Sequence, residues 1–168
     1  MFRLAIVLLL LVPSGFAQEN PVIAAARKQV AKRGKDLIEA AKVMPADKYG
    51  FKASETQMSF GHLVLHAVRA NYFLCSAMTG AEPPSTKELK DTDPKDKLVA
   101  ALEASTAYCD GAIPKVDPAK FGEEVKFPFG TMTRAEILLE LDADCADHYS
   151  IAATYLRLNG LLPPTAKK

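Results

Sequence analysis

Apolar residues recur at the helical spacing i, i+3, i+4, i+7 in four segments of the chain. The pattern predicts helices over about 21–43, 59–79, 94–113 and 133–159, and no stretch shows convincing strand alternation. Each predicted helix has one apolar face, and four such faces are best buried against one another. The fold class that we predict is therefore all-α, a four-helix bundle.

Residues that begin and end helices support these boundaries. Ser59 is the predicted N-cap of the second helix, and Gly80 follows shortly after its last apolar residues as the stop. Thr133 and Glu136 have the spacing of a capping box, in which each side chain bonds the other residue's backbone N–H. Gly160 follows the fourth helix as a stop signal. Gly34 is expected to weaken the first helix by about 1 kcal/mol relative to alanine, which a long helix tolerates.

The links between the helices are long and rich in proline. Residues 81–94 form a polar crossover segment, and residues 114–132 contain several prolines and glycines. The second of these links is too long for a simple loop between antiparallel neighbours. A plain up-down-up-down order of helices is therefore not required.

The N-terminal segment has the pattern of a secretory signal peptide. Arg3 precedes an apolar run over residues 4–12, and a small-residue site ends at Ala17. The run is shorter than the roughly 20 residues that span a bilayer as a helix. We expect cleavage near Ala17, export to the periplasm or medium, and a mature form, residues 18–168, that is a single domain outside the membrane. A retained N-terminal anchor is the competing interpretation.

Charge and cysteine content narrow the function classes. The formal net charge is +1, and removal of Arg3 leaves the mature chain neutral, so it has no basic excess for binding nucleic acid. The three cysteines, Cys75, Cys109 and Cys145, follow the predicted cleavage site. In an oxidising compartment an odd number permits at most one internal disulfide and leaves one thiol over.

Acidic residues in the fourth predicted helix suggest chemistry. Asp144 and His148 are in phase with its apolar stripe, whereas Asp142 and Asp147 turn outward to solvent. Burying an ionised carboxylate without a partner costs several kcal/mol, so Asp144 must reach water, an arginine or a cation. Residues at i and i+4 lie on one helical face, so Asp144 and His148 can converge on one ion.

A third ligand from another helix would complete a reactive metal site with an open coordination position. His66, in the middle of the second helix, is the candidate, and His62 one turn earlier is a possible alternative ligand. A single histidine in a bundle is more often a hydrogen-bonded structural residue, so a buried polar network is the competing interpretation. The chain has no G-x-S-x-G nucleophile motif and no phosphate-binding glycine loop.

Several segments resemble the DinB/YfiT-like family, especially an exported bacterial subgroup. They are "SFGHLVLHAVRANYFLCSAMTG" at 59–80, "GTMTRAEILLELDADCADHYSIAATYLRLNGLLPP" at 130–164 and "MPADKYGFK" in the first link. The resemblance implies a bundle in up-down-down-up order with long crossover links. It also implies a metal site with one histidine from the second helix and two from the fourth. By position these are His66, Asp144 and His148.

Asp144 departs from the family's usual histidine. A carboxylate can ligate Zn, Ni, Fe or Mn, so a divalent metal ion remains a chemically sound cofactor, but the change can equally mark a weakened or lost site. The family includes transferases and isomerases that use small thiols. The resemblance therefore implies a thiol-dependent transferase or a metal-dependent hydrolase with a small-molecule thiol or other small ligand as partner. Catalytic residues are not assigned. The alternative is a non-catalytic bundle that binds a small ligand or a partner subunit, and a homodimer is left open.

The implied helix order also bears on the cysteines. In this order the second and third helices run parallel, so Cys75 and Cys109 would lie at similar heights, each a few residues before the end of its helix. We therefore predict a disulfide between Cys75 and Cys109. Cys145 is rotated about 100° from Asp144 on the fourth helix, which favours burial over metal ligation.

Overall fold

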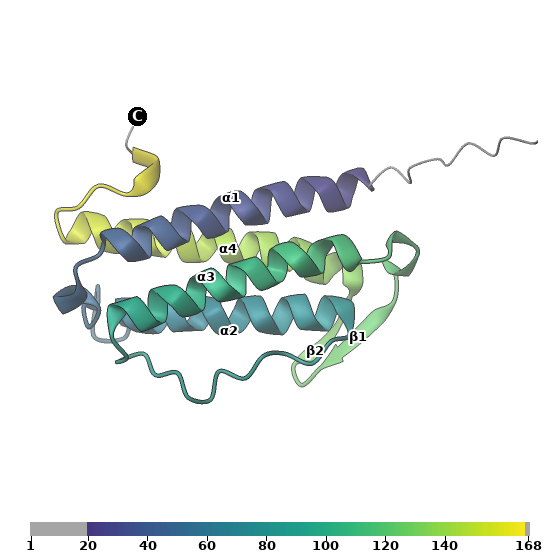
Figure 1. Cartoon of the computed structure of the whole chain (residues 1–168), viewed down its shortest axis with the longest axis horizontal. Coiled ribbons are helices and arrows are strands. Elements are labelled where there is room, and N and C mark those ends of the chain that lie inside the picture. Colours follow the sequence, from purple (N-terminus) through teal and green to yellow (C-terminus); the bar gives the residue numbers. More distant parts are fainter. Residues whose placement is uncertain (1–19, 167–168) are drawn as a thin grey trace, which may run out of the picture.

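The computed structural model describes residues 20–166, which form a bundle of four helices (Figure 1). The helices are α1 (Pro21–Val43), α2 (Phe60–Thr79), α3 (Lys95–Ala112) and α4 (Arg134–Leu158). Short 3-10 turns lie in the links and after α4, and an antiparallel hairpin of β1 (Glu124–Phe127) and β2 (Gly130–Thr133) leads into α4. The all-α bundle predicted from the hydrophobic pattern is confirmed.

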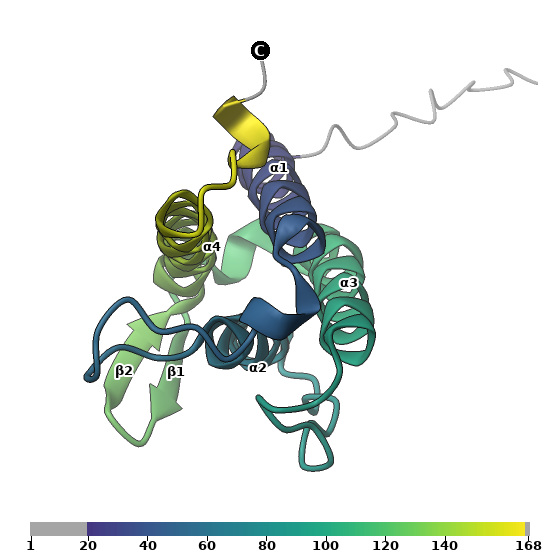
Figure 2. The same ribbon diagram turned by 90° about the vertical axis from the view of Figure 1, so that its left-hand side faces the viewer.

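The four helices stand at the corners of a square when viewed end on (Figure 2). α1 packs against α3 and α4, and α2 packs against the same two helices from the opposite corner. α2 and α3 run parallel to each other and antiparallel to α1 and α4, which confirms the up-down-down-up order. The contacts that show these directions are Asn71–Ser105 between α2 and α3, Arg27–Asp110 between α1 and α3, and Met78–Arg134 between α2 and α4.

The predicted helix ends are also confirmed. Ser59 Oγ accepts the backbone N–H of His62 at 3.1 Å, and Gly80 ends α2 with a φ of 77°, a left-handed conformation that favours glycine. Thr133 and Glu136 form the reciprocal capping box at the start of α4. These local hydrogen bonds depend on neighbouring residues, which explains why sequence alone located them.

The expectation that no strand is present was wrong for β1 and β2. Each strand has only four residues, and all of them are exposed or half-buried. β1 alternates polar and apolar residues, but four residues are too few to indicate a strand, and β2 shows no such alternation. The hairpin is held by tertiary contact, because Val125, Phe127 and Met132 pack against the core. It lies outside the square, beside α2 and α4 (Figure 2).

Two apolar clusters fill the bundle. One surrounds Phe60, Leu102 and Tyr155, and the other includes Ile137, Leu141 and the pair Cys75 and Cys109. Cys75 and Cys109 are joined by a disulfide, with 5.5 Å between their Cα atoms. This is the pairing expected from the parallel course of α2 and α3, and it ties those helices together within the core.

The segment before α1 carries the predicted signal peptide, residues 1–17, and lies outside the described residues. Among residues 20–166, no helix is both long enough and apolar enough to cross a membrane. The export prediction is taken up below as a proposal.

Gly34 has a packing role that the sequence pattern did not reveal. A Cβ atom built on Gly34 would lie 2.6 Å from Thr106 Cγ2, so α1 and α3 approach closely at this point. Thr106 cannot turn away freely, because its Oγ1 donates to the carbonyl of Leu102 at 2.8 Å. The glycine that weakens α1 locally therefore permits close packing of α1 on α3.

The variant Gly34→Ala is expected to lower the free energy of unfolding despite its better helix propensity. The propensity gain is about 1 kcal/mol, whereas overpacking against Thr106 costs about 1–3 kcal/mol. Adding Thr106→Ser removes the Cγ2 methyl group and keeps the hydroxyl, so the double variant should recover the lost stability. Urea unfolding of the single variants and the double variant measures both effects. A Gly34→Ala protein more stable than the wild type would contradict the packing argument.

Candidate metal centre

α2 and α4 bring together the three residues that the sequence singled out. His66 of α2 and Asp144 and His148 of α4 each offer one ligand atom, and these atoms all lie within 4.8 Å of one another. Asp144 Oδ2 lies 3.1 Å from His148 Nδ1, and the rings of His66 and His148 are 5.0 Å apart between centroids. We refer to these residues as the His–Asp–His group.

The donors of the His–Asp–His group fit a divalent cation. Asp144 Oδ2 and His148 Nδ1 are both buried, yet neither makes a hydrogen bond within the described structure. Their 3.1 Å separation is that expected of two ligands held about 2.0–2.2 Å from one ion. Atoms as far as 4.8 Å apart are more widely spaced than such ligands, so binding would require a modest side-chain rotation within the group.

The protonation state of His66 also suits a ligand. Burial lowers the pKa of His66 below its ordinary value, and the neighbouring His148 lowers it further, whereas the Asp144 carboxylate acts in the opposite direction. The net shift favours neutral imidazole, the form that binds metal. His148 is only 5% exposed, whereas His66 is the most exposed member, so the group opens to solvent beside His66.

A cavity of about 580 Å³ adjoins this open side. His66 and Asp144 form part of its wall, and Phe73 of α2, Phe129 of the hairpin turn and Met132 of β2 form the apolar part. The sequence pattern did not predict the contribution of the hairpin. Two phenylalanines flanking a proline in a link, where polar residues are usual, were the available signal.

The DinB superfamily matches residues 29–152, a range that includes all three members of the His–Asp–His group. The chain belongs to the DinB superfamily. This confirms the family resemblance found in the sequence. No curated protein matches the chain at the sequence level.

Crystal structures of several proteins share this DinB fold. A DinB-like protein from Bacillus cereus has a TM-score of 0.70 and 14% identity, and the match covers 84% of this chain and 95% of that protein. A DinB-like protein from Bacillus subtilis has a TM-score of 0.68 and 18% identity over 81% of this chain and 92% of that protein. A mycothiol-dependent maleylpyruvate isomerase has a TM-score of 0.64 and 18% identity over 76% of this chain and 59% of the isomerase. At these identities the likeness shows a common fold.

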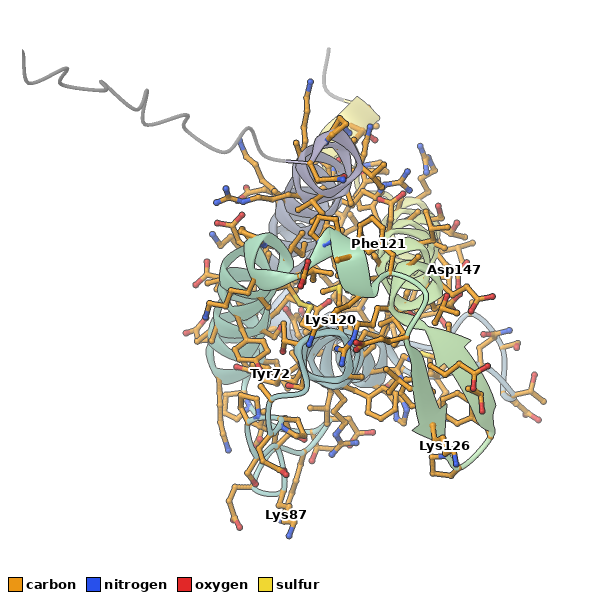
Figure 3. All side chains as sticks on the ribbon, turned by 90° about the vertical axis from the view of Figure 1, so that its right-hand side faces the viewer. Tyr72, Lys87, Lys120, Phe121, Lys126 and Asp147 are labelled. Atoms are coloured by element: carbon orange, nitrogen blue, oxygen red, sulfur yellow. A yellow bond between two sulfur atoms is a disulfide. The ribbon has the colours of Figure 1, made fainter. Side chains whose placement is uncertain are left out.

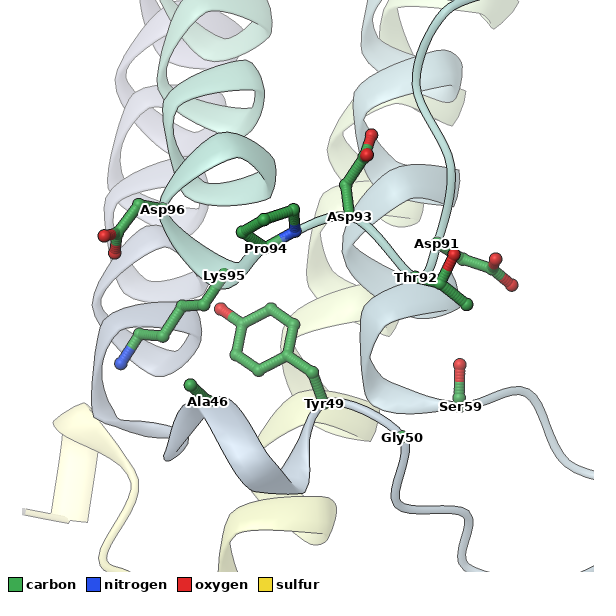
Figure 4. A pocket seen from close by; sticks show the side chains of 10 residues that line it. All are labelled: Ala46, Tyr49, Gly50, Ser59, Asp91, Thr92, Asp93, Pro94, Lys95 and Asp96. Carbon is green, nitrogen blue, oxygen red and sulfur yellow. The ribbon is translucent and has the colours of Figure 1, made fainter.

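His62, the alternative ligand, lies apart from the His–Asp–His group of this DinB chain. Its side chain is exposed, and its Nδ1 lies 3.2 Å from Asp91 Oδ2. Asp91 also lines a second cavity, of about 480 Å³, where the loop before α3 meets Tyr49 (Figure 4). Tyr49 is fixed there because its hydroxyl donates to the carbonyl of Ala41 at 2.8 Å. This second cavity contains no member of the His–Asp–His group.

The other acids of α4 do not share one environment. Asp147 is exposed at the outer surface of the bundle, as the sequence predicted (Figure 3). The prediction that Asp142 faces solvent was wrong. Asp142 is half-buried and forms an ion pair with Arg33 of α1, with 3.0 Å between Asp142 Oδ1 and Arg33 Nε. The partner lies on a different helix, so the periodicity of α4 alone did not reveal it.

Cys145 is buried, as predicted, and is not a member of the group. Burial raises the pKa of the Cys145 thiol to about 12, and the nearby carboxylates of Asp144 and Asp142 act in the same direction. The thiol lies 3.8 Å from Oδ1 of Asn71. A thiol that stays protonated at neutral pH is a poor nucleophile and a poor ligand.

Thiol labelling should reveal this inert cysteine. Native oxidised protein treated with iodoacetamide at pH 8 should remain almost unlabelled, because Cys145 is buried and protonated and the other cysteines form a disulfide. One thiol per chain should react after unfolding in urea, and three after unfolding with a reductant. Mass spectrometry counts the labels. Rapid labelling of Cys145 in the native protein would contradict the assignment.

Proposed function

We propose that this protein binds one divalent metal ion through His66, Asp144 and His148 and uses it in chemistry on a small molecule. The observation that supports the proposal best is the pair of buried donor atoms, Asp144 Oδ2 and His148 Nδ1, which face each other without a hydrogen bond. Buried polar atoms without a hydrogen bond are costly inside a protein, and a cation would satisfy both at once.

The surroundings of the His–Asp–His group favour reactive over structural metal binding. Three protein ligands leave coordination positions for a water or a substrate, and His66 stands at the cavity where a substrate can enter. A bound divalent metal lowers the pKa of a coordinated water or thiol. The negative carboxylate of Asp144 would balance part of the metal's positive charge, and buried His148 would ligate the metal from the core side.

Of the two reaction classes, thiol-dependent transfer or isomerisation is the one that we favour. The shared fold with a mycothiol-dependent isomerase supports it, whereas metal-dependent hydrolysis rests on the open site alone. A two-histidine, one-carboxylate donor set suits Zn, Ni, Fe or Mn, and we propose no single metal. A small-molecule thiol is the partner that this reaction would require.

One observation favours a non-catalytic alternative. Asp144 Oδ2 and His148 Nδ1 are already close enough to form an ion pair if His148 is protonated. A buried ion pair of this kind can specify a bundle without any metal. In that case the cavity would bind a small ligand or a partner subunit, and Asp144 would mark the loss of the family's metal site.

Metal content distinguishes the two proposals. Purified protein should carry about one divalent ion per chain after growth in metal-supplemented medium. Asp144→Ala and His66→Ala should each weaken binding by tenfold or more, because each removes one of three ligands. The matched controls are Asp147→Ala, an exposed acid on the same helix, and His62→Ala, an exposed histidine on α2. Elemental analysis and titration of the apo protein measure both quantities.

A wild-type protein that neither carries nor takes up a divalent ion would contradict the metal proposal and favour the ion-paired bundle. Asp144→His separates loss of the site from a change in its selectivity. This variant restores a nitrogen ligand at the position, so it should retain binding and shift the preference from Mn or Fe toward Zn or Ni.

We also propose that the chain is exported. Support comes from the apolar N-terminal segment with its small-residue site at Ala17 and from the Cys75–Cys109 disulfide, a bond typical of oxidising compartments.

Expression of the full chain in a bacterium should give mature protein that begins at Gln18 in the periplasm or medium. The variant Ala17→Arg places a large charged residue at the cleavage site and should accumulate as the uncut precursor. N-terminal sequencing of each fraction makes the comparison. Wild-type protein that retains Met1 throughout would contradict cleavage.

A further inference from the structure

The cavity beside the His–Asp–His group has the dimensions of a small-molecule site. Its volume is about 580 Å³, and small-molecule sites are typically about 300–1,000 Å³ and mostly apolar. His66 and Asp144 belong to its wall, so a molecule that fills it contacts the candidate metal centre directly. This continuity argues for a small ligand in preference to a protein partner.

The apolar wall of the cavity is aromatic. Phe73 of α2 and Phe129 of the hairpin turn face it, with ring centroids 6.3 Å apart, and the two side chains are 40% and 73% exposed. Phe127 stacks on Phe129 with centroids 5.2 Å apart and an angle of 4° between the rings, and it also contacts Phe73 at 5.2 Å between centroids, so the three rings form one aromatic cluster. Exposed ring faces of this kind favour the binding of a planar apolar group.

The charges around the cavity depend on the metal. Arg69 of α2 and Glu140 of α4 line it together with Asp144, and the guanidinium of Arg69 donates through Nη2 to the carbonyl of Leu89 at 3.3 Å, which leaves its positive charge without a carboxylate partner among the ion pairs of residues 20–166. Without a metal, one positive and two negative side chains give the cavity wall a net negative charge. A divalent ion on the His–Asp–His group makes the net charge positive, which favours an anion beside Arg69.

We propose that this cavity binds a small molecule that carries a planar aromatic group and an anionic group. The aromatic group lies against Phe73 and Phe129, and the anionic group lies toward Arg69 and the metal centre. The anionic half of the inference rests on the proposed metal function. The aromatic half rests on Phe73 and Phe129 and needs no metal, so the two can fail separately.

Two fluorescent probes separate these halves. 8-Anilinonaphthalene-1-sulfonate is an aromatic anion, and N-phenyl-1-naphthylamine is the matching neutral molecule. The chain has no tryptophan, so its own fluorescence does not interfere. Metal-loaded protein should bind one molecule of either probe. Phe129→Ala and Phe73→Ala should weaken both by about threefold to tenfold. Leu158→Ala, which alters a similarly exposed apolar residue of α4 outside the cavity, should leave both unchanged.

A second variant and its control test the anionic half of the inference. Arg69→Gln should weaken binding of the anionic probe by about tenfold and binding of the neutral probe by less than about twofold, because only the anion gains a charge-assisted hydrogen bond. Arg157→Gln is the control, since Arg157 bonds its own helix at the carbonyl of Ala153. Removal of the metal with a chelator should likewise weaken the anionic probe selectively.

Several results would overturn the inference. Binding of neither probe to metal-loaded protein would remove it while leaving the metal function intact. Probe binding that ignores both phenylalanine substitutions would also remove it. A wild-type dimer that dissociates on Phe129→Ala, detected by sedimentation velocity, would assign the aromatic wall to self-association instead. If the protein binds no metal, the proposed metal function is refuted, and weaker binding of the neutral probe by Phe129→Ala would still support the aromatic half.

Discussion

The parallel packing of α2 and α3 governs the rest of this structure. Two neighbouring helices that run the same way cannot be joined by a short turn, so the chain must cross the length of the bundle between them. The Cys75–Cys109 disulfide holds the two helices together in this parallel course. The side chain of Asn71 adds a link to each neighbouring helix. Its Nδ2 donates to the hydroxyl of Ser105 of α3, and its Oδ1 faces the thiol of Cys145 of α4.

This arrangement also accounts for the cavity. α3 and α4 run in opposite directions and lie at opposite corners of the square, so the segment between them must pass around the end of the bundle (Figure 2). The segment contains the hairpin, whose turn carries Phe129 to the side where His66 and Asp144 lie. The wall of the candidate site therefore comes from a connection that the helix order makes necessary.

The polar interior of the α2–α4 contact is the chemically informative part of the bundle. Asp144 and His148 follow Leu141 on α4 and precede Ala152, so the His–Asp–His group lies between residues of the two apolar clusters. Charged groups in such surroundings are retained where a cation or a proton balances them, because the apolar interior cannot. Metal binding and ion pairing are two ways of meeting the same electrostatic requirement, and the cavity beside His66 favours the first.

The hydrophobic period determined the four helices, and local capping determined their ends. These features depend on residues within a few positions of one another, as at Ser59 and at the Thr133–Glu136 capping box. The phase of α4 likewise placed Asp144 and His148 on one face without knowledge of any other helix. The place of His66 in the middle of the second helix made it the candidate third ligand, and the family resemblance supported it over His62. The helix order came from the resemblance.

Contacts between distant segments were decided only in the tertiary structure. Arg33 meets Asp142 across two helices, Thr106 meets Gly34 where α1 and α3 approach closely, and the hairpin folds because the core is there to pack against. A residue's spacing along one helix carries no information about which distant side chain faces it. The sequence by itself thus determined the four helices and the candidate donors, whereas packing decided the hairpin, the partners of the donors, the close helix approach and the cavity.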